Sequence, residues 1–187
     1  MKFKQIIKNV AVILGLSDVV SLVNDTLKHN SQNAKAELRG NINFAVLLRC
    51  VNFVVANIAT NYFPLVARQS FVVTNGRIRL SEFEKPLVSI RQIARNGREV
   101  EHKLHSGYIN VPNGNLHVEY SYMPQIKTGE EQNPFEITPS AIEYGILSEY
   151  AFISGMMNEA TVWNGKFTEL LFNAKRGRGK TMPAGMR

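Results

Sequence analysis

The hydrophobic period of this chain changes twice, and this order of blocks constrains the fold more than any other feature. At both ends, apolar residues recur at three- and four-residue steps, which predicts helices with one apolar face. Between residues 68 and 122, apolar residues alternate with polar ones around turn-forming pairs, which predicts antiparallel strands. Helices with one apolar face must cover it against one another. We therefore predict an α+β fold: a bundle of about four to five helices from both chain ends, with an inserted antiparallel β-sandwich or curled sheet.

The N-terminal block predicts three helices. The first spans residues 3–16, the second begins at Ser17 and Asp18, and the polar segment 29–35 is expected to be a loop. The third has apolar residues at helical steps from Phe44 to Tyr62 and ends before Pro64, because proline disfavours helical geometry in the preceding residue. We expect its apolar stripe to pack in the core, with a groove or a subunit contact as the alternative. Its polar residues are expected to face outward: Arg49, Asn52, Asn57 and Asn61.

The middle block contains three Asn-Gly pairs, at residues 75–76, 96–97 and 113–114. Both residue types tolerate the left-handed backbone that two-residue hairpin turns require, so these pairs predict hairpins. The clearest alternation runs from Leu116 to Tyr122 and predicts a strand with one exposed face. Residues 123–137 contain proline, glycine and adjacent glutamates. They predict an irregular connector that either wraps a neighbouring subunit or forms a mobile surface loop.

Helical spacing returns after Thr138-Pro139, a suitable N-cap followed by proline at the first helical position. Two antiparallel helices are predicted here, with a break at residues 155–158. Trp163 is expected to anchor the core, and Gly165 to weaken the second helix. The predicted organisation is therefore a helical bundle from residues 1–66 and 138–175, a β insertion at 67–123, an extended connector at 124–137 and a basic tail at 176–187.

Charge is concentrated at the two ends of the chain. The net charge is +7, yet residues 139–174 carry one basic and four acidic residues, whereas residues 175–187 carry five basic residues and no acidic one. The basic end is either a solvated tail or a contact for nucleic acid or an acidic protein surface. The candidate residues for a partner, portal or polyanion contact are Lys175, Arg176, Arg178, Lys180 and Arg187.

The sequence argues against an enzyme, a metal site or a cofactor site. Cys50 is the only cysteine; it lies in an apolar helical run and is expected to be buried and inert. His102, His105 and His117 lack a completing ligand set, so we expect them to be exposed hairpin residues. Residues 174–181 resemble a phosphate-binding loop, but such a loop needs a strand before it and a helix after it. We also expect no signal peptide, because Lys8 interrupts the N-terminal apolar run, and no spanning stretch of about 18 uncharged apolar residues.

Two segments resemble a known family. The helical hairpin of residues 141–175 begins Ala-Ile-Glu-Tyr-Gly-Ile-Leu-Ser-Glu-Tyr, and residues 51–65 read Val-Asn-Phe-Val-Val-Ala-Asn-Ile-Ala-Thr-Asn-Tyr-Phe-Pro-Leu. The hairpin resembles the C-terminal helices of head–tail connector (adaptor) proteins of tailed bacteriophages. The second segment is similar to the long helix of that family, which leads into a β insertion. Gly165 and the long basic tail depart from the pattern.

The resemblance implies a structural protein of the virion neck, assembled in the host cytoplasm, with no enzymatic activity, cofactor or membrane partner. Such proteins form rings, usually dodecamers, that join the capsid portal protein to the tail or further neck proteins and line the channel for packaged DNA. By analogy, the segment from Lys175 would dock on the portal. The alternative function is a nucleic-acid-binding module with a flexible basic C-terminal arm.

Overall fold

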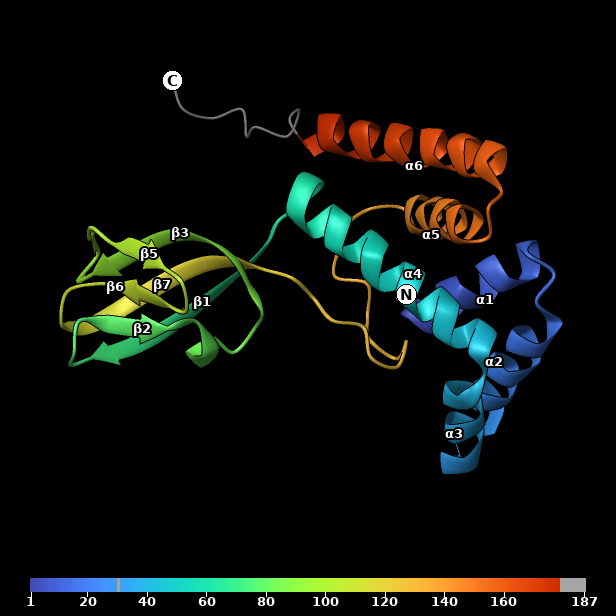
Figure 1. The fold of residues 1–187 in the computed structure, drawn as a ribbon, viewed down its shortest axis with the longest axis horizontal. Helices are drawn as coiled ribbons and strands as arrows, with labels where there is room; N and C mark the ends of the chain where they lie inside the picture. Colours follow the sequence, from blue (N-terminus) through green and yellow to red (C-terminus); the bar gives the residue numbers. More distant parts are fainter. Residues whose placement is uncertain (30, 179–187) are drawn as a thin grey trace, which may run out of the picture. The chain divides into compact units, whose positions relative to one another are not determined.

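A computed structural model of the chain describes residues 1–29 and 31–178, with only the backbone of Arg178 (Figure 1). The chain divides into two compact units. One, the helical unit, comprises Met1–Asn57 and Gln125–Arg187, and the other, the β unit, comprises Ile58–Pro124. The predicted α+β class is confirmed: helices come from both chain ends, and two antiparallel sheets lie between them in sequence.

The described part of the helical unit contains six α-helices: α1 (Phe3–Ile13), α2 (Ser17–His29), α3 (Gln32–Gly40), α4 (Ile42–Asn57), α5 (Pro139–Ile153) and α6 (Met157–Arg178). Helix α4 packs against α1, α3 and α5, and α6 runs alongside α5 (Figure 1). Segments far apart in sequence therefore share one core. Its fully buried side chains include Phe3, Ile6, Phe44, Leu47 and Ile142.

Helix α3 corrects the prediction of a loop at residues 29–35. The Ser31 hydroxyl accepts a hydrogen bond from the Ala34 amide at 3.2 Å and caps the helix, but only Leu38 of α3 is buried. Leu38 is the one large apolar residue of α3, too few to mark a recurring apolar stripe, so the sequence pattern did not reveal the helix.

The connector is not the mobile surface loop that was one of its two predicted forms, because it is fastened to its own subunit. The amides of Phe3 and Lys4 donate to the carbonyls of Glu131 and Gly129, at 3.0 and 2.7 Å. Further along, Phe135 and Ile137 are buried. Main-chain hydrogen bonds and apolar anchors together make the connector part of the helical unit.

Two side chains predicted from helical spacing lie differently in the structure. Asn52 of α4 was expected to face outward, but its side chain is half-buried and holds the connector through Ile126. Trp163 was expected in the core, but it is only partly buried. Its ring stacks on Tyr144 of α5, with ring centroids 5.5 Å apart and Lys166 above both rings. The buried side of α6 is instead formed by Ala160, Phe167 and Leu171.

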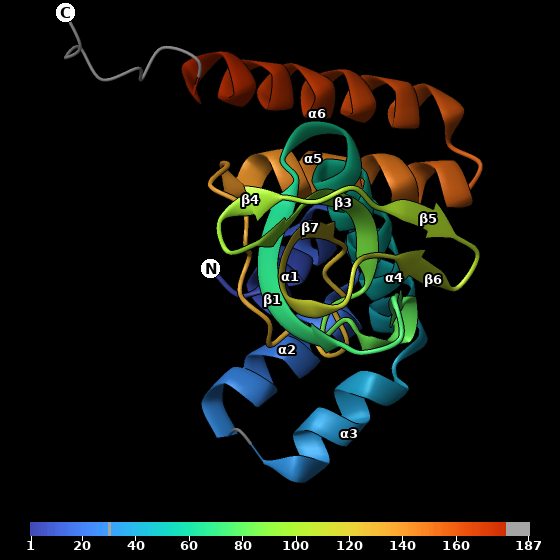
Figure 2. The same cartoon turned by 90° about the vertical axis from the view of Figure 1, so that its left-hand side faces the viewer.

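The β unit begins with a π-helical turn, Ile58–Tyr62, and contains seven strands. Strands β1 (Leu65–Val73), β7 (Gly114–Tyr122), β3 (Leu87–Arg95) and β4 (Arg98–Glu99) form one antiparallel sheet in that order. Strands β2 (Arg77–Arg79), β6 (Tyr108–Asn110) and β5 (Lys103–His105) form the second. Figure 2 shows the strands curving around the unit's centre. Both sheets contribute to one core, which includes Phe71, Ile78, Ile93, Ile109 and Tyr120.

One of the three Asn-Gly pairs forms the predicted two-residue hairpin. Asn96 and Gly97 both have positive φ and join β3 to β4, as that turn type requires. The other two pairs connect strands of different sheets, and the Asn113 side chain accepts a hydrogen bond from the Gly76 amide at 2.7 Å. These two turns therefore bind each other instead of closing hairpins. A second two-residue hairpin, at residues 106–107, joins β5 to β6.

One segment, Ile42–Tyr62, is long and apolar enough to cross a membrane by length and composition, with a mean hydropathy of 1.8. It includes α4, and Arg49 interrupts it. Of the most apolar 18-residue window in this segment, 44% is buried within the protein, and the core helix of a soluble protein can have the same length and composition.

Candidate interaction surfaces

The described residues contain no cluster of side chains suited to a metal ion. No group of three or more His, Cys, Asp or Glu side chains among residues 1–29 and 31–178 is placed to hold a metal ion. Cys50 is 1% exposed, as expected for a core thiol, and burial raises its pKa to about 11. The thiolate, which is the reactive form, is therefore scarce near neutral pH.

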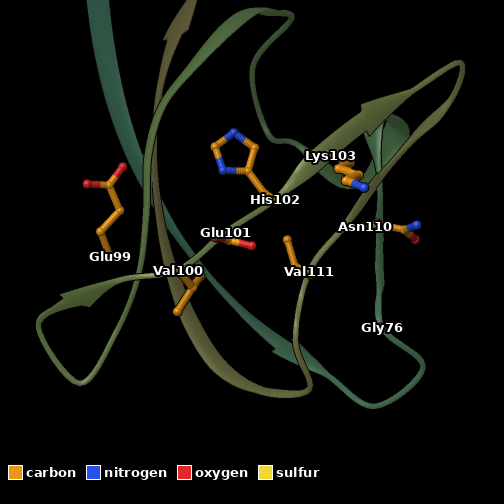
Figure 3. A pocket seen from close by; sticks show the side chains of 8 residues that line it. All are labelled: Gly76, Glu99, Val100, Glu101, His102, Lys103, Asn110 and Val111. Carbon is orange, nitrogen blue, oxygen red and sulfur yellow. The ribbon is translucent and has the colours of Figure 1, made fainter.

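The predicted exposure of the β-unit histidines holds for His102, which lines a shallow depression of about 640 Å³ (Figure 3). Glu99, Glu101 and Lys103 border the same depression. Two carboxylates beside one ammonium and one imidazole give a surface of mixed charge. This surface lacks the converging ligands of a metal site.

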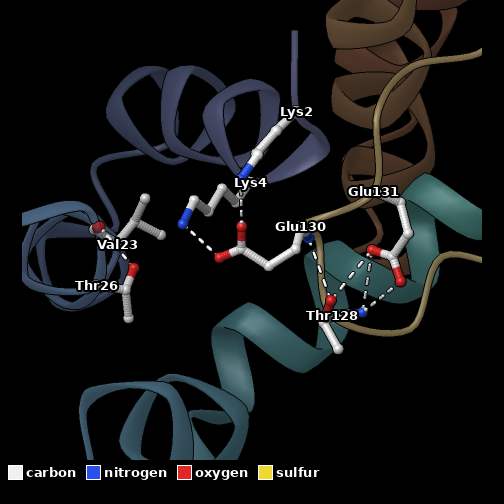
Figure 4. A network of polar contacts seen from close by, with 7 residues as sticks. All are labelled: Lys2, Lys4, Val23, Thr26, Thr128, Glu130 and Glu131. Atoms are coloured by element: carbon white, nitrogen blue, oxygen red, sulfur yellow. Dashed lines mark hydrogen bonds and ion pairs between the residues drawn. The ribbon is translucent and has the colours of Figure 1, made fainter. Parts of the chain in front are cut away.

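A polar network fixes the connector to the start of α1 (Figure 4). Lys2 donates to the Glu130 carboxylate at 2.9 Å, and Lys4 donates to its other oxygen. The hydrogen bond from Lys4 is the largest cause that holds the pKa of Glu130 below its ordinary value. The side chain of Lys4 is 5% exposed, so its charge is compensated inside the unit. Nearby, Glu131 accepts hydrogen bonds from the Thr128 amide and hydroxyl. These are structural contacts that close a turn.

The predicted contact residues of the basic end fall into two groups. Lys175 and Arg176 are exposed on the last turns of α6, and the backbone of Arg178 is the end of that helix. The helix therefore extends three residues beyond the predicted boundary at 175. Lys180 and Arg187 lie outside the described residues.

A second surface on the same hairpin was not predicted. The turn between α5 and α6 exposes Phe152, Ile153 and Met157 by 60, 54 and 56%, with Met156 also exposed. Val162, about one helical turn further along α6, is 58% exposed. We call these five residues the hairpin tip. The sequence carried a signal for them: two apolar pairs flank Gly155, whose φ of +76° marks a turn, and a short turn cannot direct all four side chains into one core.

No protein-family model matches this chain, and no curated protein sequence matches it. The likeness to head–tail connectors therefore remains a prediction from the residues.

Proposed function

We propose that this chain is a non-enzymatic structural protein of a phage virion, a ring-forming head–tail connector that joins the capsid portal to the tail. The observation that carries the proposal is the hairpin tip, which lies on the helical hairpin that resembles this family. The resemblance supplies the identity of the assembly, and the tip supplies a reason for the subunit to associate.

The hairpin tip is an unfavourable surface for an isolated subunit. Its five large apolar side chains are exposed within one short stretch of the chain, residues 152–162. Burying a side chain of this size contributes about 1.5–3 kcal/mol. Contiguous exposed apolar patches are typical of association surfaces. In a closed ring each subunit presents the same surface to a neighbour, so one patch is covered at every interface.

The direct test is electron microscopy of the purified protein, alone and with the portal protein of the same phage. We expect symmetric annuli that bind the portal. Mass photometry over a concentration series would give the number of subunits. A protein that stays monomeric both alone and with the portal, yet binds DNA through the segment after Lys175, would favour the alternative of a nucleic-acid-binding module.

A charge placed in the hairpin tip should prevent assembly without unfolding the subunit. Phe152→Lys introduces an ammonium where a neighbour would bury an aromatic ring, and we expect it to shift the protein to monomers. Asn164→Lys is the matched control, because Asn164 is also exposed, lies on α6 and gives the same change in charge. Far-UV circular dichroism would verify folding of both variants. If Phe152→Lys assembles like the control, the hairpin tip is not the association surface.

A further inference from the structure

The three-stranded sheet of the β unit has one apolar face and one cationic face. Residues opposite each other in neighbouring strands direct their side chains to the same side. Ile109 pairs with Ile78 and Leu104, and both isoleucines are buried in the core. The residues on either side of this row therefore face outward: Arg77, Arg79, Lys103, His105, Tyr108 and Asn110. We call these six residues the cationic face.

Contacts within this face hold its side chains in place. Tyr108 lies on the central strand β6, with its ring stacked on His105 at 4.8 Å between centroids and 14° between planes. Arg77, from the strand on the other side, lies over the same ring with its guanidinium carbon 4.8 Å from the centroid. Asn110 is 3.4 Å from the His105 ring nitrogen. The Tyr108 ring thus positions Arg77 and His105, and the Asn110 amide contacts His105 from the same strand.

The cations of this face are exposed and are not held in the ion pairs that the structure describes. Within the described part of the chain, Arg77, Arg79 and Lys103 take part in no ion pair, and all three are exposed. The face itself contains no carboxylate. Carboxylates border it in two places: Glu82 lines a depression of about 500 Å³ together with Arg77 and Arg79, and Glu99 and Glu101 line another together with Lys103.

We infer that the cationic face binds the phosphate backbone of double-stranded DNA without reading its sequence. The three strands place the cations across about 10 Å, since neighbouring strands lie roughly 4.8 Å apart. Duplex DNA presents about six phosphate charges over the same axial length. Arg77, Arg79 and Lys103 can therefore contact phosphates at the same time. The two arginines also offer planar donor forks that suit phosphate oxygens.

The arrangement of Tyr108 excludes recognition by base stacking. Single-strand-binding proteins stack bases on free aromatic faces. Here, residues from both neighbouring strands already lie against the ring. Contacts from cations alone position a protein on DNA and carry no sequence information. This inference concerns the β unit of a single subunit, so it does not depend on ring assembly.

The test is fluorescence anisotropy of the full-length protein with labelled 20-base-pair duplexes of two unrelated sequences, over a salt series. We compare the wild type with Arg77→Gln/Arg79→Gln/Lys103→Gln. Removing three phosphate contacts should lower the slope of log K against log salt by about 2.7 and weaken binding in about 0.1 M salt roughly tenfold or more. Both duplexes should behave alike. Lys85→Gln/Arg91→Gln/Arg98→Gln is the matched control, because it removes the same charge from exposed positions elsewhere in the β unit.

Three outcomes would overturn the inference. The first is an equal loss of slope in both triple variants, which would mean that only net charge matters. The second is an unchanged slope in the cationic-face variant. This result would mean that the cationic face does not bind DNA and that any binding comes from the basic end of the chain. The third is binding of poly-glutamate but not DNA with the same dependence on Arg77, Arg79 and Lys103, which would make this face a dock for acidic protein. None of these outcomes bears on whether subunits form rings. Conversely, a protein that does not assemble into rings could still give the expected anisotropy result.

Discussion

Replacing Gly145 by alanine tests how closely the helices of the bundle pack. Gly145 lies in α5, and an added Cβ would be 2.8 Å from Cγ1 of Val54 in α4 and 3.0 Å from Cε2 of Phe167 in α6. Both neighbours are buried, and the β-branched side chain of Val54 has little rotameric freedom. One methyl group at this position therefore requires Val54 to move away and leaves the Phe167 ring in a contact that is too tight.

The size of the effect follows from two opposing terms. Overpacking a core by a methyl group costs about 1–3 kcal/mol, and alanine in place of glycine inside a helix recovers about 1 kcal/mol. We expect Gly145→Ala to destabilise the protein by about 1 kcal/mol. An added Cβ at Gly165 of α6 would have no atom within 4 Å. Gly165→Ala should therefore gain the helix propensity of alanine without a steric clash. The difference between the two variants, about 1–3 kcal/mol, isolates the steric term.

Urea unfolding followed by circular dichroism at the helical band measures both variants under conditions where the protein is monomeric. Thermal unfolding followed at the same band should give midpoints that differ by about 2–4 °C for each kcal/mol. Val54→Ala removes the closest clashing atom, so it should cost less in the Gly145→Ala background than in the wild type, with a coupling of about 0.5–3 kcal/mol. Equal stability of Gly145→Ala and Gly165→Ala would show that α4, α5 and α6 do not meet at this residue.

Two further substitutions test how the connector is held. Asn52→Ala removes both hydrogen bonds to the Ile126 backbone and should cost about 1–3 kcal/mol, with faster amide exchange at Ile126 and faster proteolysis of residues 125–137. Glu130→Gln weakens the contacts with Lys4. Because the folded pKa of Glu130 is lowered, its contribution is present above the unfolded value and is lost as pH falls through the folded value. The variant should thus be less stable at neutral pH, by roughly 1 kcal/mol after solvent screening, and should approach the wild type as the pH falls below the folded pKa of Glu130.

Each connector variant has a control elsewhere on the helical unit. Asn158→Ala and Glu169→Gln change the same residue types at exposed positions of α6 and should leave stability within about 0.5 kcal/mol. If Asn52→Ala leaves exchange at Ile126 unchanged, the side chain does not hold the connector. A deficit of Glu130→Gln that persists in acid would show that lost packing, not charge, explains it.

Local features of the sequence were enough to predict most element types. Pro64 lies just beyond the π-helical turn that follows α4, and Pro139 is the first residue of α5. Both helix boundaries follow from the fixed φ and the missing N–H of proline, whose effects extend over one or two residues. The Asn96-Gly97 hairpin was also predictable, because its positive φ values are a property of those two residues. The Thr138 N-cap was correctly placed, although its side chain makes no capping hydrogen bond.

The candidate surfaces were less predictable, because they combine residues that are distant in sequence. Nothing in the spacing of α4 singled out Asn52, because only tertiary packing brings the main chain of Ile126, 74 residues away, to its amide. The hairpin tip had a partial signal in its apolar pairs. The cationic face had none, because Arg77 and Lys103 are 26 residues apart and share a surface only through the pairing of β2 and β5 with β6.

By itself, then, the sequence determined the order of helical and strand blocks, the α+β class and the starts of α1, α2 and α5. These depend on hydrophobic period and on the backbone preferences of single residues, which act over a few positions. The tertiary structure decided which polar side chains form contacts within the subunit and which remain exposed for a partner. That outcome depends on strand register and on contacts between distant segments, and neither is encoded in any short stretch of the chain.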